Sequence, residues 1–210
     1  CELLAVRVAP GLGEEARAVA EAMRSPGPLD AFTPGDTCPD NHSLAGGRIR
    51  FYDFEFSAFR PALLDAAYFR VPFPTCWCVS RVPGDLAARM DDAYRAAAAP
   101  AFPAIADEAF YRREMAHALA CWLLVTLNFV PIAGLHLEGA LAEDKPWGPV
   151  SLRQRHVHRL ESFAATAEGW GRLPALAETA RALAARLRER WPGAEMPDYA
   201  AFRGSSDLRF

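Results

Sequence analysis

The most informative part of the sequence reads Phe32-Thr33-Pro34-Gly35-Asp36-Thr37-Cys38-Pro39-Asp40-Asn41, and Arg48-Ile49-Arg50-Phe51-Tyr52-Asp53-Phe54-Glu55 follows it shortly afterwards. Proline, glycine, aspartate and asparagine crowd the first part, and these residue types favour turns over regular helix or strand. Between the two parts, Ala45-Gly46-Gly47 has the composition of a tight turn. We therefore expect a polar loop that leads directly into a β-hairpin, with strands near Ser43–Ala45 and Arg48–Asp53.

Helical periodicity dominates the chain on both sides of this loop and hairpin. Apolar residues recur at the spacing of one helix face before the loop and in several segments after Pro61. Ser151 offers an N-cap for the helix that begins at Leu152. The segment from Pro131 to Pro149 lacks periodicity and is expected to be a long loop. The expected helices cover Gly13–Arg24, Ala62–Arg70, Gly84–Ala98, Ala106–Phe129, Leu152–Ala167 and Leu176–Trp191.

Composition narrows the class of protein. The 210 residues are 51% hydrophobic and 23% charged, with a formal net charge of -3, so no basic surplus favours nucleic acid as a partner. The most apolar segment, Ala116 to Leu135, is interrupted by His117, Asn128 and Pro131, which argues against a membrane span. Five cysteines without a CxxC pair predict reduced thiols and a cytoplasmic protein.

The loop and hairpin together resemble a known motif. In aminoglycoside phosphotransferases and choline kinases, a catalytic loop of the form H-G-D-x-x-P-x-N precedes a hairpin and an apolar strand that ends in D-F-E or a similar triplet. This chain has G-D-T-C-P-D-N, ending at Asn41, and D-F-E, beginning at Asp53. The resemblance is close over residues 32–70, and the helical remainder is only consistent with it.

The resemblance implies a fold and a set of functional residues. The fold would be α+β and mainly α-helical, a protein-kinase-like C-terminal lobe over residues 1–210, with the helix, catalytic loop and metal-binding hairpin in 1–60 and a helical substrate-binding part in 61–210. Asp36 matches the catalytic base, Asn41 and Asp53 match the ligands of Mg²⁺, and Asp65 matches an acidic residue that supports the catalytic loop through backbone hydrogen bonds.

The implied reaction is transfer of the γ-phosphate of ATP to a hydroxyl group of a small, possibly aminated molecule. Phosphoryl transfer asks the protein for positioning and for neutralisation of charge. A carboxylate beside the attacking hydroxyl and oxygen ligands for magnesium supply both, which is why these residue types are needed at this spacing.

Two departures from the family pattern stand out. Pro34 occupies the position where the family usually has a histidine that braces the loop. Only 35 residues precede Asp36, too few for the sheet lobe that covers the nucleotide, and the single lysine, Lys145, lies far downstream. Because the chain also begins at Cys1 rather than Met, we expect a piece of a longer protein that is inactive by itself.

Two other functions stay open at this stage. A pseudokinase would keep the fold for binding or regulation, and Pro34 and the missing nucleotide lobe favour it. The chain could also be a helical binding module without a nucleotide role, in which case the spacing of the motif would match the family by coincidence.

The remaining chemical groups carry weaker signals. Cys76 and Cys78 are expected to pack beneath the loop, because two thiols alone do not make a structural metal site and a disulfide between residues so close would be strained. An acceptor pocket that takes cationic substrates would need acidic or aromatic walls, although each candidate is more often a surface or packing residue. The candidates are Asp91, Asp92, Glu138, Glu143, Asp144, Trp147 and Trp170.

Overall fold

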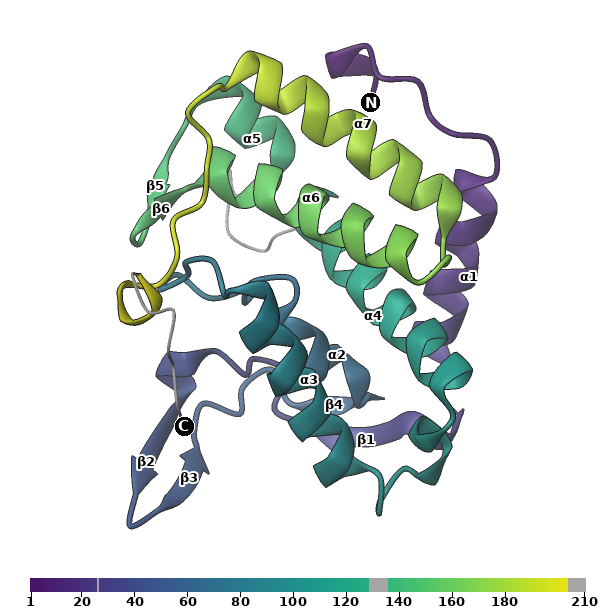
Figure 1. Cartoon of the computed structure of the whole chain (residues 1–210), viewed down its shortest axis with the longest axis vertical. Helices are drawn as coiled ribbons and strands as arrows, with labels where there is room; N and C mark the ends of the chain where they lie inside the picture. The colour runs from purple at the N-terminus through teal and green to yellow at the C-terminus, as the bar shows by residue number, and fades with distance from the viewer. Residues whose placement is uncertain (26, 129–135, 204–210) are drawn as a thin grey trace.

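The computed structural model describes residues 1–25, 27–128 and 136–203, and it shows a mainly helical α+β protein with small antiparallel hairpins (Figure 1). The helices are α1 (Leu12–Arg24), α2 (Leu63–Ala66), α3 (Gly84–Ala98), α4 (Glu108–Asn128), α5 (Leu137–Ala142), α6 (Leu152–Gly169) and α7 (Pro174–Arg190). The strands are β1 (Asp30–Thr33), β2 (His42–Ala45), β3 (Arg48–Phe51), β4 (Ala58–Pro61), β5 (Pro146–Trp147) and β6 (Val150–Ser151).

The core lies between the long helices. α6 and α7 run side by side, α4 crosses behind them, and α1 flanks α4 and α7 (Figure 1). Met115 and Leu119 of α4 and Leu160 and Phe163 of α6 are almost completely buried. Burial of large apolar side chains is the main force that holds such a layer together, so these helices form the base on which the loop segments rest.

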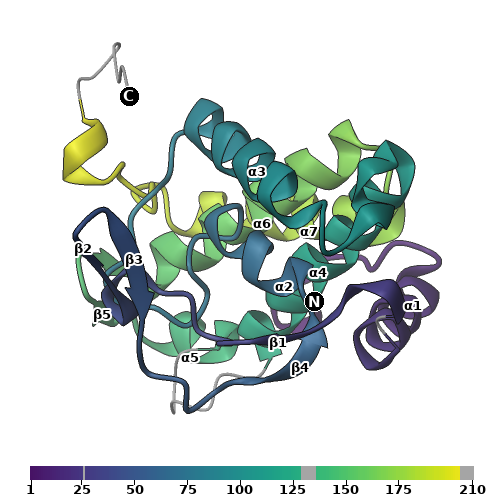
Figure 2. The same cartoon turned by 90° about the horizontal axis from the view of Figure 1, so that it is seen from below.

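Two pairs of antiparallel strands lie on the opposite side of the molecule from α7 (Figure 1). β1 pairs with β4, with Asp30 opposite Pro61, and β2 pairs with β3, with His42 opposite Phe51. Gly46 and Gly47 join β2 to β3 with φ values of 58° and 71°, a conformation that glycine adopts without steric cost. Seen from below, β1 and β4 run beneath α2, while the β2–β3 hairpin lies to one side (Figure 2).

Apart from the helix expected over Ala62–Arg70, the expected helices and the β2–β3 hairpin are confirmed, with bounds that differ by a few residues. The helix expected over Ala62–Arg70 is only one α-helical turn, α2, followed by a 3₁₀ turn at Ala67–Phe69. The long loop expected over 131–149 is wrong in its second part, which contains α5 and β5, and residues 129–135 lie outside the described part of the chain. These elements are too short to produce a periodic pattern.

The β1–β4 pair was not expected, and it bears on the division of the chain at residue 60. Its two strands are four residues each and lie far apart in the sequence, so no local turn signals their pairing. β4 spans residue 60, the boundary placed between the two parts of the domain. A continuous hydrophobic core that extends from Leu4 to Met196 includes residues from both parts.

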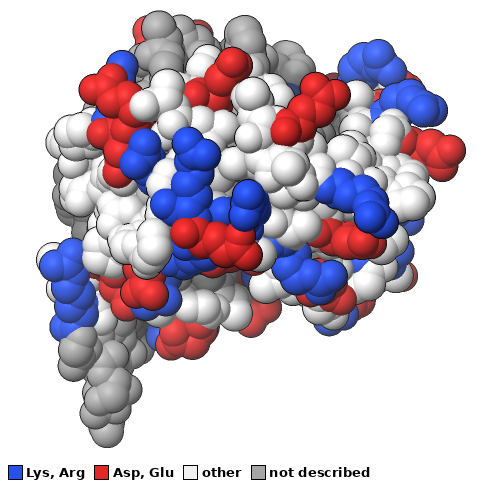
Figure 3. All heavy atoms as spheres, turned by 90° about the horizontal axis from the view of Figure 1, so that it is seen from above, with Lys and Arg blue, Asp and Glu red and all other residues white. Residues whose placement is uncertain are grey.

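In the described ranges, no helix combines the length and the hydropathy that crossing a bilayer requires. On the face viewed from above, basic and acidic side chains are interspersed (Figure 3). That arrangement fits the small net charge of the sequence.

Candidate active site

The loop after β1 turns sharply at Gly35. Its φ of +78° lies in the left-handed region, and a Cβ at this position would collide with the backbone carbonyl of Phe56 and approach the Arg60 guanidinium within 2.9 Å. Glycine is therefore required where the loop passes the β3–β4 connection. The turn presents the next residue, Asp36, in a half-buried position.

Two hydroxyl groups hold the Asp36 carboxylate. Thr75 Oγ1 donates to Asp36 Oδ1 at 2.6 Å, and Tyr68 Oη lies 3.4 Å from the same oxygen. Tyr68 also donates to the Gly35 carbonyl at 3.0 Å and lies 2.9 Å from Thr75 Oγ1. The carboxylate contacts both involve Oδ1, so the loop is fixed while Oδ2 stays available to a second group.

Asn41 is oriented by the loop that contains Asp36. Its Nδ2 donates to the Asp36 carbonyl at 3.1 Å, and the residue is only 9% exposed. Since the two hydrogens of a carboxamide belong to its nitrogen, this bond assigns Oδ1 as the atom that remains to bind a ligand. The Asn41 side chain is thus joined to the Asp36 backbone by a direct hydrogen bond.

Asp53 reaches the same end of the hairpin through strand pairing. The Tyr52 amide donates to the Asn41 carbonyl at 3.0 Å, which extends the β2–β3 register by one step. Asp53 then adopts a left-handed conformation with φ of 63° and is exposed. Aspartate tolerates this conformation better than most residues, and here it directly follows Tyr52, the residue that pairs with Asn41.

Asp65 lies on α2, and its environment differs from the expectation. Burial raises its pKa to about 6, while the positive charge of Arg60 and the nearby Thr33 hydroxyl lower it. Within the described ranges, neither Asp65 Oδ1 nor Thr33 Oγ1 has a hydrogen-bond partner of ordinary geometry. Among the described residues, the side chains that donate hydrogen bonds to the loop include Tyr68, Thr75 and Trp77, so support of the loop by Asp65 stays a prediction.

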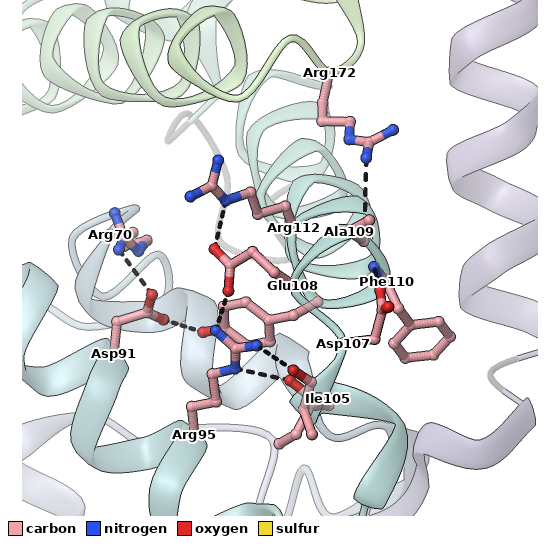
Figure 4. A network of polar contacts seen from close by, with 12 residues as sticks. Arg70, Asp91, Arg95, Ile105, Asp107, Glu108, Ala109, Phe110, Arg112 and Arg172 are labelled. Atoms are coloured by element: carbon pink, nitrogen blue, oxygen red, sulfur yellow. Dashed lines mark hydrogen bonds and ion pairs between the residues drawn. The ribbon is translucent and has the colours of Figure 1, made fainter.

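Three of the acidic candidates for the acceptor pocket have partners within the protein. Asp91 is 6% exposed and is held by the Arg70 guanidinium at 2.8 Å and by the Tyr111 hydroxyl (Figure 4). Such a buried, fully paired carboxylate stabilises the packing of α3 on α4 rather than lining a pocket. Glu143 is exposed and forms an ion pair with Lys145, and Asp144 accepts a hydrogen bond from the Arg153 amide.

Both tryptophan candidates are already stacked on cations. The Arg155 guanidinium lies 4.3 Å from the Trp147 ring centroid, and the Arg70 guanidinium lies 5.2 Å from that of Trp170. These ring faces are therefore engaged within the protein. No acceptor pocket can be assigned from them.

The prediction of reduced thiols is wrong for two of the five cysteines. Cys38, inside the loop between Asp36 and Asn41, forms a disulfide bond with Cys76, with Cα atoms 5.5 Å apart. Cys1, Cys78 and Cys121 are free. The sequence does not reveal the pairing because the two cysteines are separated by 38 positions and meet only through the packing of the loop on residues 71–82.

Tyr68 and Thr75 are site residues that the sequence analysis missed. Neither belongs to the motif, and both lie beyond the hairpin, so only tertiary packing brings their hydroxyls to Asp36. The site thus offers one braced carboxylate, one oriented amide oxygen and one exposed carboxylate, a set of hard oxygen ligands that suits Mg²⁺ better than a softer metal. The chain matches no protein-family model, and no curated protein is significantly similar to it.

Proposed function

We propose that the chain is the catalytic-loop lobe of an ATP-dependent phosphotransferase that acts on a hydroxyl group of a small molecule. The observation that carries the proposal is the hydrogen bond from Asn41 Nδ2 to the Asp36 carbonyl. It ties a potential base to a potential metal ligand within one loop, as the resemblance to aminoglycoside phosphotransferases implies. The protein-kinase-like fold of this lobe is part of the same proposal.

In this proposal each residue has a separate task. Asp36 accepts the proton of the attacking hydroxyl through Oδ2, because Oδ1 is already held by Thr75. Asn41 Oδ1 and the Asp53 carboxylate would hold Mg²⁺, and the chemistry that a bound Mg²⁺ would supply is neutralisation of charge on phosphate oxygens. Tyr68 and Thr75 position Asp36 and do not contact the reacting atoms.

The proline at position 34 is compatible with a braced catalytic loop. The family uses a histidine at this place to hold the loop, whereas this chain has two hydroxyl groups on the Gly35–Asp36 segment. Tyr68 and Thr75 can therefore supply the bracing. The departure at Pro34 does not by itself favour a pseudokinase.

The surface next to the site is suited to a covering domain. Large apolar side chains are exposed on the two hairpins and their connections, including Phe32, Phe54, Phe56 and Phe59. Exposed apolar residues that gather in this way commonly mark an interaction surface. In this proposal, the nucleotide-binding lobe that a kinase requires packs on this side of the site.

Magnesium-dependent ATP turnover tests the proposal, measured in the complete protein that contains this chain with aminoglycosides, choline and amino sugars as acceptors. Asp36→Asn is expected to lower kcat by about 10²- to 10⁴-fold, because the general base is lost while the size of the side chain is kept. Asn41→Ala and Asp53→Asn are expected to raise the magnesium concentration needed for half-maximal rate.

Asp30→Asn is the matched control, since Asp30 is an exposed carboxylate at the start of β1. It should leave turnover unchanged. Binding of Mg·ATP without turnover would indicate a pseudokinase, and absence of both binding and turnover would indicate a helical binding module.

A further inference from the structure

Three sulfur atoms and one carboxylate converge beside the loop. Cys38, Asp40, Cys76 and Cys78, here called the Cys₃Asp cluster, each offer one ligand atom, and these four atoms all lie within 4.8 Å of one another. Cys78 Sγ is 3.0 Å from Cys76 Sγ, and Asp40 Oδ1 is 3.6 Å from Cys76 Sγ. A disulfide needs only two of these groups, so the other two call for a separate explanation.

The spacing fits the ligand shell of a tetrahedral zinc ion. With Zn–S bonds of about 2.3 Å and Zn–O bonds of about 2.0 Å, neighbouring ligand atoms in a tetrahedron lie roughly 3.5–3.8 Å apart. The distances of 3.0 and 3.6 Å from Cys76 Sγ to Cys78 Sγ and Asp40 Oδ1 approach that size, and reduction of the disulfide would let Cys38 Sγ move away from Cys76 Sγ to match it. Two ligands come from the loop, Cys38 and Asp40, and two come from residues 76–78, so the metal would join segments that are distant in sequence.

The surroundings of the cluster resemble the outer shell of a metal centre. Trp77 Nε1 donates to Asp40 Oδ2 at 2.6 Å, which orients the carboxylate with Oδ1 toward the cysteines. Arg155 donates to the carbonyls of Cys76 and Trp77 at 2.7 and 2.6 Å, and so fixes the backbone between the two cysteine ligands. Ligand atoms held in this way lose little freedom when a metal binds.

The positive charges of two buried arginine side chains favour an anionic metal centre at the Cys₃Asp cluster. Arg155 and Arg159 are 1% and 3% exposed, and in the described part of the chain their hydrogen bonds go to backbone carbonyls, with no carboxylate in an ion pair with either. Burying a guanidinium without an anion is costly. Three thiolates and a carboxylate around Zn²⁺ carry a net negative charge. This charge would compensate the two guanidinium groups, whose hydrogen bonds go to the carbonyls of Pro74, Cys76 and Trp77.

We propose that, in the reduced protein, Cys38, Asp40, Cys76 and Cys78 bind a structural zinc ion that fastens the Asp36–Asn41 loop to residues 75–78. A dithiol reductant first converts the Cys38–Cys76 disulfide into two thiols, transferring two electrons and two protons, and is itself oxidised to a disulfide. Each of the three thiols then releases its proton to solvent as Zn²⁺ binds. The site goes beyond the phosphotransferase proposal and would exist even if that proposal were wrong.

Metal binding by the reduced 210-residue chain tests the site directly. The chain is reduced, freed of metal by a chelator and titrated with Zn²⁺ or Cd²⁺, and bound metal is counted after gel filtration. We expect one metal ion per chain, a thiolate-to-cadmium charge-transfer band, and protection of Cys38, Cys76 and Cys78 from alkylation while the exposed Cys1 still reacts.

Cys78→Ser is the informative variant because Cys78 lies outside the disulfide and the oxidised fold stays intact. It should weaken metal binding by more than about tenfold, whereas Cys121→Ser, at a partly buried cysteine of α4, should leave binding unchanged. Far-UV circular dichroism checks that both variants fold. If the reduced chain takes up no zinc or cadmium, or if Cys78→Ser binds them as tightly as the wild type, the cluster is a disulfide with a neighbouring thiol and the zinc assignment is wrong.

Discussion

Two hydroxyl groups hold the Asp36 carboxylate and the backbone just before it. Thr75 holds one carboxylate oxygen at 2.6 Å, and Tyr68 holds the preceding carbonyl at 3.0 Å. Burial raises the pKa of Tyr68, and the charge of Asp36 adds to this effect, so the phenol keeps its proton at neutral pH and remains a donor. The arrangement restrains Asp36 through hydrogen bonds to hydroxyl groups.

Asp65 is a second residue whose surroundings matter, because it makes stability depend on pH. Its pKa is raised from 3.8 to about 6 in the folded protein, mainly by burial, so folding favours the protonated form. The stabilisation that the protonated Asp65 gives to the folded state is complete below about pH 4 and is lost as pH rises through about 6. Ionised Asp65 therefore costs about 3 kcal/mol at pH 7.

Asp65→Asn is expected to raise the free energy of unfolding at pH 7 by up to about 3 kcal/mol and to match the wild type near pH 4. Urea denaturation at several pH values measures this difference. Asp92→Asn, at an exposed position of α3, serves as the control and should show no such convergence. An Asp65→Asn protein that is less stable than the wild type at pH 7 would show that Arg60 compensates the buried carboxylate.

Among the individual elements, α6 begins with a reciprocal cap. The backbone N–H of Gln154 donates to Ser151 Oγ at 3.4 Å, and the backbone N–H of Ser151 donates to the Gln154 side-chain Oε1 at 2.8 Å. This helix carries Arg155 and Arg159, which hold residues 74–77 beside the candidate site. The cap therefore fixes the start of α6, and with it the positions from which the two arginine side chains extend toward residues 74–77.

Ser151→Ala is expected to lower the free energy of unfolding by about 1 kcal/mol, because amide groups in the first turn of α6 lose their partner. Ser162→Ala in the middle of the same helix is the control and should change stability by less than half as much, since alanine favours the helix interior. Thermal and urea denaturation provide the measurement. Equal effects of the two substitutions would mean that the cap does not contribute.

Across the whole molecule, the buried and exposed phenylalanines have opposite roles. Phe163 of α6 is 1% exposed within the helical core, while Phe59 of β4 is 74% exposed and contacts Phe32 edge-on with ring centroids 5.6 Å apart. Apolar side chains stabilise a fold in proportion to the area they remove from water. The apolar side chains on the hairpins therefore add little to the stability of this chain alone.

We expect Phe163→Ala to lower the free energy of unfolding by about 3–5 kcal/mol and Phe59→Ala to change it by less than about 1 kcal/mol. The two substitutions remove the same type of side chain, once from a buried and once from an exposed position. Urea denaturation of both variants measures the difference. A large loss of stability in Phe59→Ala would show that the hairpin face belongs to the core of this chain, and would argue against a covering domain there.

Local sequence was sufficient to predict the long helices and the β2–β3 hairpin. These features depend on neighbouring residues: apolar periodicity over several turns and the Gly46–Gly47 turn. Local patterns survive folding because they are stabilised by contacts that are close in sequence.

Tertiary packing alone accounts for the β1–β4 pair, the hydroxyls of Tyr68 and Thr75 on the loop, the burial of Asp91, and the meeting of Cys38 with Cys76 and Cys78. Each of these contacts joins residues that lie about 20 to 40 positions apart. Such contacts form because the helical core places their segments against one another, and no periodic or turn signal in the chain encodes that placement.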